Sequence, residues 1–134
     1  MVKGASGDTG TGPVTTKTVG DGAETLALRH LQQQGLVLVE RNYRVARGPG
    51  ARAGEVDLVM CERDGTLVFV EVRARAGLAH GGAASSVTSA KQRRIVFAAR
   101  HYLLQMATLP PCRFDVVAVQ GGRIEWIRAA FDAA

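Results

Sequence analysis

Two apolar segments in the middle of the chain decide the fold: residues 54–62, Gly-Glu-Val-Asp-Leu-Val-Met-Cys-Glu, and residues 66–75, Thr-Leu-Val-Phe-Val-Glu-Val-Arg-Ala-Arg. Both are rich in large and β-branched apolar side chains, which is typical of central β-strands. They nevertheless carry charged side chains, which are costly to bury: Glu55, Asp57, Glu71, Arg73 and Arg75. This conflict makes the two segments the most informative part of the chain.

The turn between the two strands determines whether Asp57 and Glu71 face each other. A two-residue loop would put them on opposite faces of the hairpin. A three-residue loop, 63–65, with its glycine in the left-handed region, pairs Glu62 with Thr66 and sets Asp57 opposite Glu71. We favour the second register because it gathers one wholly apolar face: Val56, Leu58, Met60, Val68, Val70 and Val72.

Two carboxylates directly opposite each other repel unless a positive charge lies between them. That charge is either Arg73, as a structural ion pair, or a bound cation. Oxygen ligands with water completing the coordination suit Mg²⁺ or Mn²⁺ rather than zinc. The favoured register also sets Glu55 opposite Arg73, so these two side chains could simply pair. The residues alone leave the ion-pair and metal interpretations open.

The flanking sequence predicts a single domain over residues 21–134, preceded by a flexible Gly-, Thr- and Ser-rich tail over residues 1–20. Asp21 is expected to cap a helix that ends at Gly35. Glu24, three residues after Asp21, would complete a capping box.

The remaining elements alternate between strand and helix patterns. A strand is predicted over residues 36–46, with Val37, Val39, Tyr43 and Val45 on one face, interrupted there by Arg41. A helix is predicted over residues 88–107, with Ile95, Ala99, Tyr102, Leu103 and Met106 buried. Strands over 113–120 and 123–128 follow, joined by Gly121-Gly122. The order predicts an α/β domain with a mixed sheet covered on both faces.

Composition narrows the class of protein only partly. The net charge of +5 and 46% hydrophobic residues fit a globular protein with a polyanionic partner, but equally one with a solvated basic surface. No segment is apolar enough to span a membrane, and the N-terminus lacks the apolar core of a signal peptide. Cys61 and Cys112 match no metal or redox spacing and are expected to be buried thiols. These features favour a cytoplasmic protein.

Six motifs together resemble the bacterial YraN family, a group of small proteins of unassigned function. Their order and spacing carry the resemblance over about residues 22–120. They are Gly22-Ala-Glu24, Glu40-Arg-Asn42-Tyr43-Arg, Gly54-Glu55-Val-Asp57-Leu-Val, Val68-Phe-Val-Glu71-Val-Arg73-Ala-Arg75, Ser89-Ala-Lys91-Gln92-Arg93-Arg94 and Cys112-Arg113-Phe114-Asp115-Val116-Val.

An acid on the first helix, then Asp57, then Glu71-Val72-Arg73 also resembles the PD-(D/E)xK arrangement of restriction-endonuclease-like and Holliday-junction-resolvase-like folds. The resemblance implies a three-layer α/β/α nuclease fold that acts on DNA or RNA, including branched or structured forms. It implies that Asp57, Glu71 and Glu24, with the backbone carbonyl of Val72, hold one or two Mg²⁺ or Mn²⁺ ions beside the scissile phosphate. By analogy, a homodimer is a further expectation.

The chain departs from that motif at Arg73, where lysine is usual. Arginine cannot lose its proton to activate water, although its planar fork suits phosphate oxygens. Hydrolysis would then depend on metal-bound hydroxide or on Lys91 approaching from the second helix. The alternatives are a nucleic-acid-binding module without turnover, and a protein in which these charges form a structural network.

Basic side chains outside the strands are candidates for contacts to nucleic acid. Lys91 and Arg94 share a helix face near its N-terminus, although such charges usually mark a solvated face. A groove tracking a phosphate backbone could combine them with Arg41, Arg44, Arg47, Arg52 and Arg75. Gln92 and His80 are further candidates, whereas Trp126 is expected to pack rather than stack on bases.

Overall fold

The computed structural model describes residues 16–46, 53–74 and 86–133. Within these ranges, seven elements follow one another: α1 (Thr16–Gln33), β1 (Val37–Val45), β2 (Gly54–Cys61), β3 (Leu67–Ala74), α3 (Ser89–Leu103), β4 (Cys112–Gln120) and β5 (Arg123–Phe131). The strands form one open sheet in the order β1-β2-β3-β4-β5. Neighbours are antiparallel except for β3 and β4, which are parallel. The expected α/β order and mixed sheet are confirmed.

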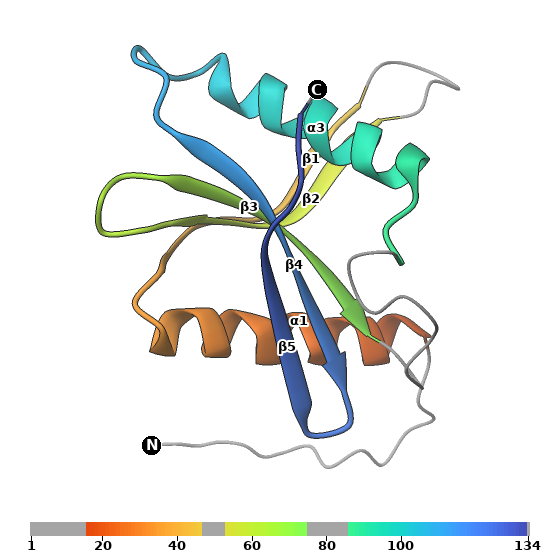
Figure 1. Cartoon of the computed structure of the whole chain (residues 1–134). Helices are drawn as coiled ribbons and strands as arrows, with labels where there is room; N and C mark the ends of the chain where they lie inside the picture. Colours follow the sequence, from red (N-terminus) through yellow and green to blue (C-terminus); the bar gives the residue numbers. More distant parts are fainter. Residues whose placement is uncertain (1–15, 47–52, 75–85, 134) are drawn as a thin grey trace.

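The two helices cover opposite faces of the sheet, which makes three layers (Figure 1). Each helix buries its own apolar cluster. The cluster between α1 and the sheet includes Leu28, Leu31, Leu58, Met60 and Val70. The cluster between α3 and the sheet includes Val59, Phe69, Ile95, Ala98 and Phe114. Central strands that are buried on both faces read as near-continuous apolar runs, as β3 and β4 do.

Helix α1 begins at Thr16, five residues before the expected start. Asp21 therefore lies inside the helix, and its assignment as an N-cap was wrong. The helix thus includes residues 16–20, which were assigned to the tail, and residues 1–15 lie outside the described part of the chain. The predicted end of the helix is confirmed, because Gly35 adopts a φ of 101°, in the left-handed region that glycine tolerates.

Two further boundaries differ from expectation. Helix α3 begins after Thr88, whose hydroxyl accepts a hydrogen bond from the Lys91 N–H, but it ends at Leu103. Met106 thus lies beyond the helix and is 37% exposed, not buried. Strand β5 continues three residues further than predicted, to Phe131. Of the two cysteines expected to be buried, Cys61 is half-buried and Cys112 is exposed.

The predicted register of the β2–β3 hairpin is confirmed. Pairing runs from Cys61 opposite Leu67 to Leu58 opposite Val70. In the turn, the Glu62 N–H donates to the Thr66 carbonyl at 2.9 Å, and Gly65 has a φ of 94°. The turn chemistry and the apolar pattern were sufficient to predict this register.

The apolar face was predicted correctly except at Val56. Leu58 and Met60 pack beneath α1, whereas Val56 packs beneath α3. The cause lies in the neighbouring strand, where Asn42 has a φ of 56° and breaks the alternation of side chains. On either side of it, Arg41 contacts α1 and Tyr43 contacts α3. Strand β2 therefore turns its buried side chains from the α3 side of the sheet at Val56 to the α1 side at Leu58, with Asp57 between them.

Strand β1 also departs from simple alternation near its start. Its register against β2 shifts between Leu38 and Glu40. Val37 and Val39 are consequently exposed, while Leu38 packs on the cluster beneath α1. The expected apolar face of this strand survives only at Tyr43 and Val45.

Candidate functional site

The backbone pairing between strands β2 and β3 ends next to Asp57. Backbone pairing stops at Leu58 and Val70, and the next free N–H of β3, that of Val72, donates to Asp57 Oδ2 at 2.8 Å. Figure 1 shows the two strands diverging beyond this point. We call the region between residues 54–57 of β2 and residues 71–74 of β3 the fork. A side chain has replaced a backbone partner there, so the Asp57 carboxylate lies in the fork.

Glu71 faces Asp57 from the other strand of the fork. Its side chain is 3% exposed, and its Oε1 is buried without a hydrogen-bond partner among the described residues. Burial, and then the neighbouring Asp57 charge, raises the pKa of Glu71 to about 8. Burial also raises the pKa of Asp57, while the Val72 N–H and the Glu71 carboxyl group oppose that rise. The raised pKa values predict that the metal-free pair holds one proton at neutral pH.

Lys91 reaches the fork from the first turn of α3. Its Nζ lies 2.8 Å from Glu55 Oε2 and 3.8 Å from Glu71 Oε2, and its side chain is only 16% exposed. The hydrogen bond from Lys91 lowers the pKa of Glu55. The sequence left open a pairing of Glu55 with Arg73; in the structure Glu55 pairs with Lys91 from α3, and Arg44 lies 3.9 Å away.

Arg73 provides a second positive charge beside the same acid. Its Nη1 lies 3.6 Å from Glu71 Oε2, and its side chain is 38% exposed. Since Glu71 and Arg73 are two residues apart on one strand, they project from the same face. Glu71 is therefore flanked by an ammonium group from α3 and a guanidinium group from β3.

Glu24 approaches from the opposite layer without joining the pair. Its Oε1 accepts hydrogen bonds from Arg41 Nε at 2.9 Å and from Asn42 Nδ2 at 3.1 Å. Its negative charge contributes, after burial, to the raised pKa of Asp57. Across residues 16–46, 53–74 and 86–133, no three His, Cys, Asp or Glu side chains are grouped closely enough to hold one ion. The described arrangement is a carboxylate pair with a third acid nearby.

The pair nevertheless fits a small divalent cation. Mg²⁺ is usually held by one or two carboxylates, with water and substrate phosphate completing its octahedron. A buried oxygen without a hydrogen-bond partner, as at Glu71 Oε1, is available for such a bond. The donor set is all oxygen, which excludes a typical zinc site.

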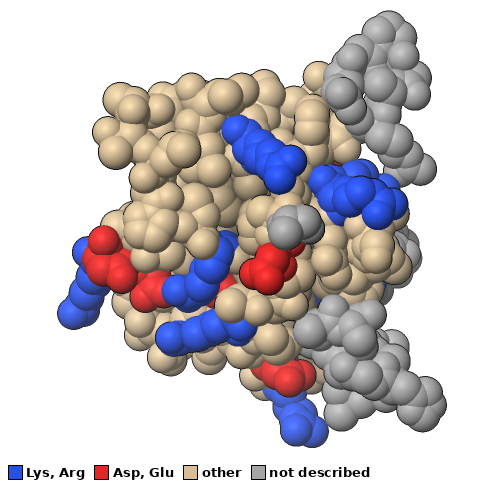
Figure 2. All heavy atoms as spheres, turned by 45° about the horizontal axis from the view of Figure 1, so that its top comes forward, with Lys and Arg blue, Asp and Glu red and all other residues tan. Residues whose placement is uncertain are grey.

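The remaining predicted site residues are dispersed. Arg44 is largely exposed and lies 3.9 Å from Glu55 at its closest. Gln92 donates to the Val87 carbonyl and so braces the start of α3. Arg47, Arg52, Arg75 and His80 lie outside the described residues. Figure 2 turns the α3 side forward and shows, among the described residues, basic side chains with acidic ones between them.

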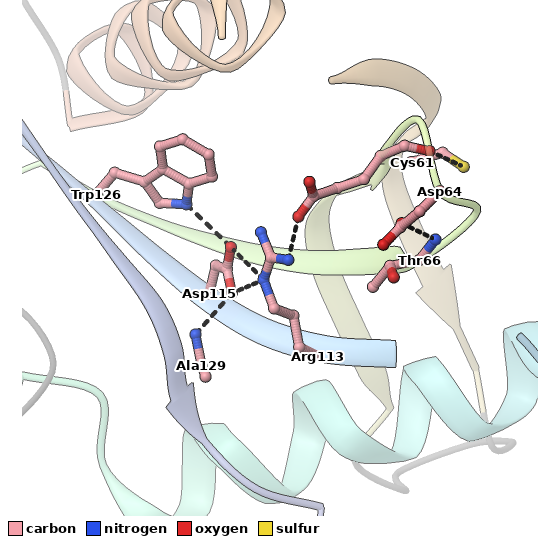
Figure 3. Close-up of polar contacts among 8 residues, drawn as sticks. Cys61, Asp64, Thr66, Arg113, Asp115, Trp126 and Ala129 are labelled. Carbon is pink, nitrogen blue, oxygen red and sulfur yellow. Dashed lines mark hydrogen bonds and ion pairs between the residues drawn. The ribbon is translucent and has the colours of Figure 1, made fainter. Parts of the chain in front are cut away.

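Sequence reasoning missed another buried acid, Asp115 in β4, which is fully buried. Figure 3 shows three groups converging on it: Arg113 Nε at 3.0 Å, Trp126 Nε1 at 2.9 Å and the Ala129 N–H at 2.9 Å. Arg113 continues the network to Glu62. The sequence did contain a signal for it, because Asp115 is an acidic residue inside an otherwise apolar strand. Arg113, Trp126 and Ala129 give Asp115 a structural role, and Trp126 packs as predicted.

Asp115 has a definable mechanical role. The register of β4 against β5 shifts between Phe114 and Val116, and Ala129 adopts a φ of 50°. The carboxylate accepts the Ala129 N–H that this irregularity leaves without a strand partner. Asp115 therefore stabilises the bend in β5 and takes no part in the fork.

No helix in the described ranges has the length and hydropathy needed to cross a membrane.

Comparison with known proteins identifies one group. The model of the uncharacterised protein family UPF0102 matches residues 23–119. A UPF0102 protein of Methylibium petroleiphilum is 66% identical over 90% of this chain and 99% of its own length. One from Albidiferax ferrireducens is 60% identical over 89% of this chain and 91% of its own. The chain belongs to the uncharacterised protein family UPF0102, the YraN family.

Proposed function

We propose that this protein is a metal-dependent endonuclease acting on DNA or RNA, with Asp57 and Glu71 as the carboxylate ligands of Mg²⁺ or Mn²⁺. The observation that carries the proposal is the buried pair in the fork, where Glu71 Oε1 has no hydrogen-bond partner among the described residues and where burial beside Asp57 raises the pKa of Glu71 to about 8. Natural proteins seldom retain such a pair in a central strand without a functional reason.

The parted strands supply further groups around the pair. The Val72 N–H holds one oxygen of Asp57, which orients the carboxylate. The N–H and C=O of a strand residue project to the same side, so the Val72 carbonyl is directed into the fork as well. Glu24, which lies near Asp57 in the α1 layer, would act on the site through its charge or through a bound water.

The two cations next to Glu71 suit a phosphodiester substrate. A bound divalent ion would polarise the phosphate and lower the pKa of the attacking water. Arg73 can neutralise charge that develops on the phosphoryl oxygens, since its guanidinium fork matches them. Lys91, held by Glu55, brings an ammonium group to 3.8 Å from Glu71 in a chain whose strand carries Arg73 in place of the motif lysine. The PD-(D/E)xK likeness of Asp57 and Glu71-Val72-Arg73 supports this assignment.

Cleavage assays with matched variants test the proposal. Wild-type protein should cut a structured or branched nucleic acid in the presence of Mg²⁺ or Mn²⁺, and Asp57→Asn should abolish cutting while melting cooperatively. Asp64→Asn, an acid exposed in the β2–β3 turn, is the matched control and should cut at the wild-type rate. Equal cutting by Asp57→Asn would contradict the proposal.

Arg73 favours a second candidate function, a nucleic-acid-binding module without turnover. A guanidinium group cannot serve as a base, so Arg73, at the strand position of the motif lysine, cannot activate water by removing its proton. This candidate predicts salt-dependent binding with no cutting by wild type under either metal, and a gain of cutting in Arg73→Lys.

A further inference from the structure

A groove of about 960 Å³ runs along the outer side of α3, between the helix and the last residues of the chain. Its lining includes Arg93, Arg94, Arg100 and Phe97 from the helix, with Asp132 across from them. Three guanidinium groups against one carboxylate give the groove a basic lining. None of these residues belongs to the carboxylate pair of the fork.

The arginines are arranged along the helix rather than clustered at its end. Arg93, Phe97 and Arg100 follow one another at four- and three-residue spacing, so they share a face. Arg93 and Arg100 are separated by about 10 Å along the axis, roughly the length occupied by three successive phosphates of one strand. The groove therefore offers repeated cationic contacts instead of a pocket for a single anion.

The guanidinium groups are available for an external partner. Within the described chain, no acid lies in ion-pair range of Arg93 or Arg94. Arg100 donates only to the Ala133 carbonyl, at 3.2 Å. Arginines without intramolecular acids retain their full capacity to bind phosphate oxygens.

The groove and the fork both adjoin the first turn of α3. Ser89 and Ala90 line the groove, while Lys91, the next residue, reaches Glu55 and Glu71 from the opposite face of the helix. Ala53 also lines the groove, and the chain then enters β2 at Gly54, which packs tightly against α3. A strand held in the groove would therefore approach Asp57 and Glu71 by passing over the first turn of α3.

We propose that the groove holds the phosphodiester backbone of one nucleic-acid strand on one side of the reacting phosphate, through Arg93, Arg94 and Arg100. The proposal rests on the proposed function, since it assumes a nucleic-acid substrate at the fork. Contacts of this kind position a strand without reading its bases.

Fluorescence anisotropy with a labelled DNA strand, without divalent metal, tests the groove separately from catalysis. The variant is Arg93→Gln/Arg94→Gln, and the control is Arg29→Gln/Arg123→Gln, which removes the same charge from exposed residues on α1 and the β4–β5 hairpin. We expect Kd to rise at least ~10-fold in the groove variant and less than ~2-fold in the control. The slope of log Kd against log salt should fall by about 0.7 per lost phosphate contact.

Each outcome is decisive. Equally weakened DNA binding in both variants would mean that net charge alone binds the strand. Unchanged DNA binding in both variants would also overturn the groove. Both results leave the proposed function intact if wild type binds DNA. Failure of wild type to bind or cut any nucleic acid would overturn the proposed function and the groove together. Groove-dependent binding to anionic lipid vesicles, with binding to DNA unchanged, would assign the groove to a membrane surface instead.

Discussion

At the scale of single residues, Glu71 concentrates the unusual physical chemistry of this protein. It is an acid buried in a central strand, opposite another acid, with two cations at 3.6 and 3.8 Å. Those cations only partly offset desolvation, because the pKa of Glu71 still rises to about 8. The folded protein therefore carries a destabilising feature at neutral pH, which is typical of functional sites.

The raised pKa predicts a pH dependence of stability for the metal-free protein. Below pH 4.5 Glu71 is protonated in both the folded and unfolded chain. Between about 4.5 and 8 the unfolded chain has lost this proton and the folded one retains it, so the free energy of unfolding falls as pH rises. Glu71→Gln should remove most of this fall and be more stable than wild type at pH 8, by up to several kcal/mol.

Chemical denaturation at pH 5, 6, 7 and 8 measures this effect. Glu125→Gln, an exposed acid on β5, is the control and should keep the wild-type dependence on pH. If Glu71→Gln also followed the wild-type curve, Glu71 would be ionised in the folded protein at neutral pH.

The shared proton predicts that metal binding is itself linked to pH. A cation requires both carboxylates ionised, so binding at pH 7 should displace about one proton. Affinity should rise between pH 6 and 8 and then level off. Titration calorimetry in two buffers of different ionisation enthalpy gives the number of protons released, and a value near zero would refute the shared proton.

At the scale of elements, the site depends on how closely β2 approaches α3. A Cβ on Gly54 would lie 2.7 Å from Phe97 Cδ2 and 2.8 Å from both the Arg94 carbonyl oxygen and the Ala98 nitrogen. Two of these three atoms are backbone and cannot rotate away. The absence of a side chain at Gly54 thus lets α3 bring Lys91 to Glu55 and Glu71.

Gly54→Ala should therefore push α3 away and destabilise the protein by about 1–3 kcal/mol. Gly22→Ala provides the contrast, because this glycine lies inside α1 with no atom within 4 Å of an added Cβ. That substitution should raise the free energy of unfolding by about 0.5–1 kcal/mol. Denaturant titrations compare the two, and equal effects would contradict the close packing at Gly54.

The β4–β5 pair contains a second acid whose role is to shape the sheet. Asp115→Ala would remove the acceptor for Arg113, Trp126 and the Ala129 N–H together, leaving three partly buried hydrogen-bond donors unpaired. We expect a loss of about 3–5 kcal/mol in stability, with metal binding retained by the folded fraction. Loss of metal binding in folded Asp115→Ala protein would show that the network extends into the fork.

At the scale of the whole molecule, the order of elements and the hairpin register could be predicted, because both follow from local signals. Gly65 sets the turn, and the apolar alternation around Leu58 and Val70 allows only one pairing. The facing of Asp57 and Glu71 followed from that register. The family resemblance then added Glu24. In the structure, Glu24 lies near the pair, but its carboxylate accepts hydrogen bonds from Arg41 and Asn42.

What could not be predicted depends on contacts between elements distant in sequence. The face change at Val56 arises from the left-handed backbone of Asn42 in the next strand. The position of Lys91 depends on the packing of α3 over Gly54, which no pattern within the helix encodes. Alternation within β2 and β3 therefore paired Glu55 with Arg73, while the folded chain pairs it with Lys91.

The central claim is that Asp57 and Glu71 form one divalent-metal site. Its most direct test is calorimetric titration of Mn²⁺ into wild-type protein, Asp57→Asn and Asp64→Asn at pH 8, where the pair is least protonated. Wild type and Asp64→Asn should bind the ion with the same affinity, and Asp57→Asn should not bind it. No binding by wild type, or undiminished binding by Asp57→Asn, would contradict the account.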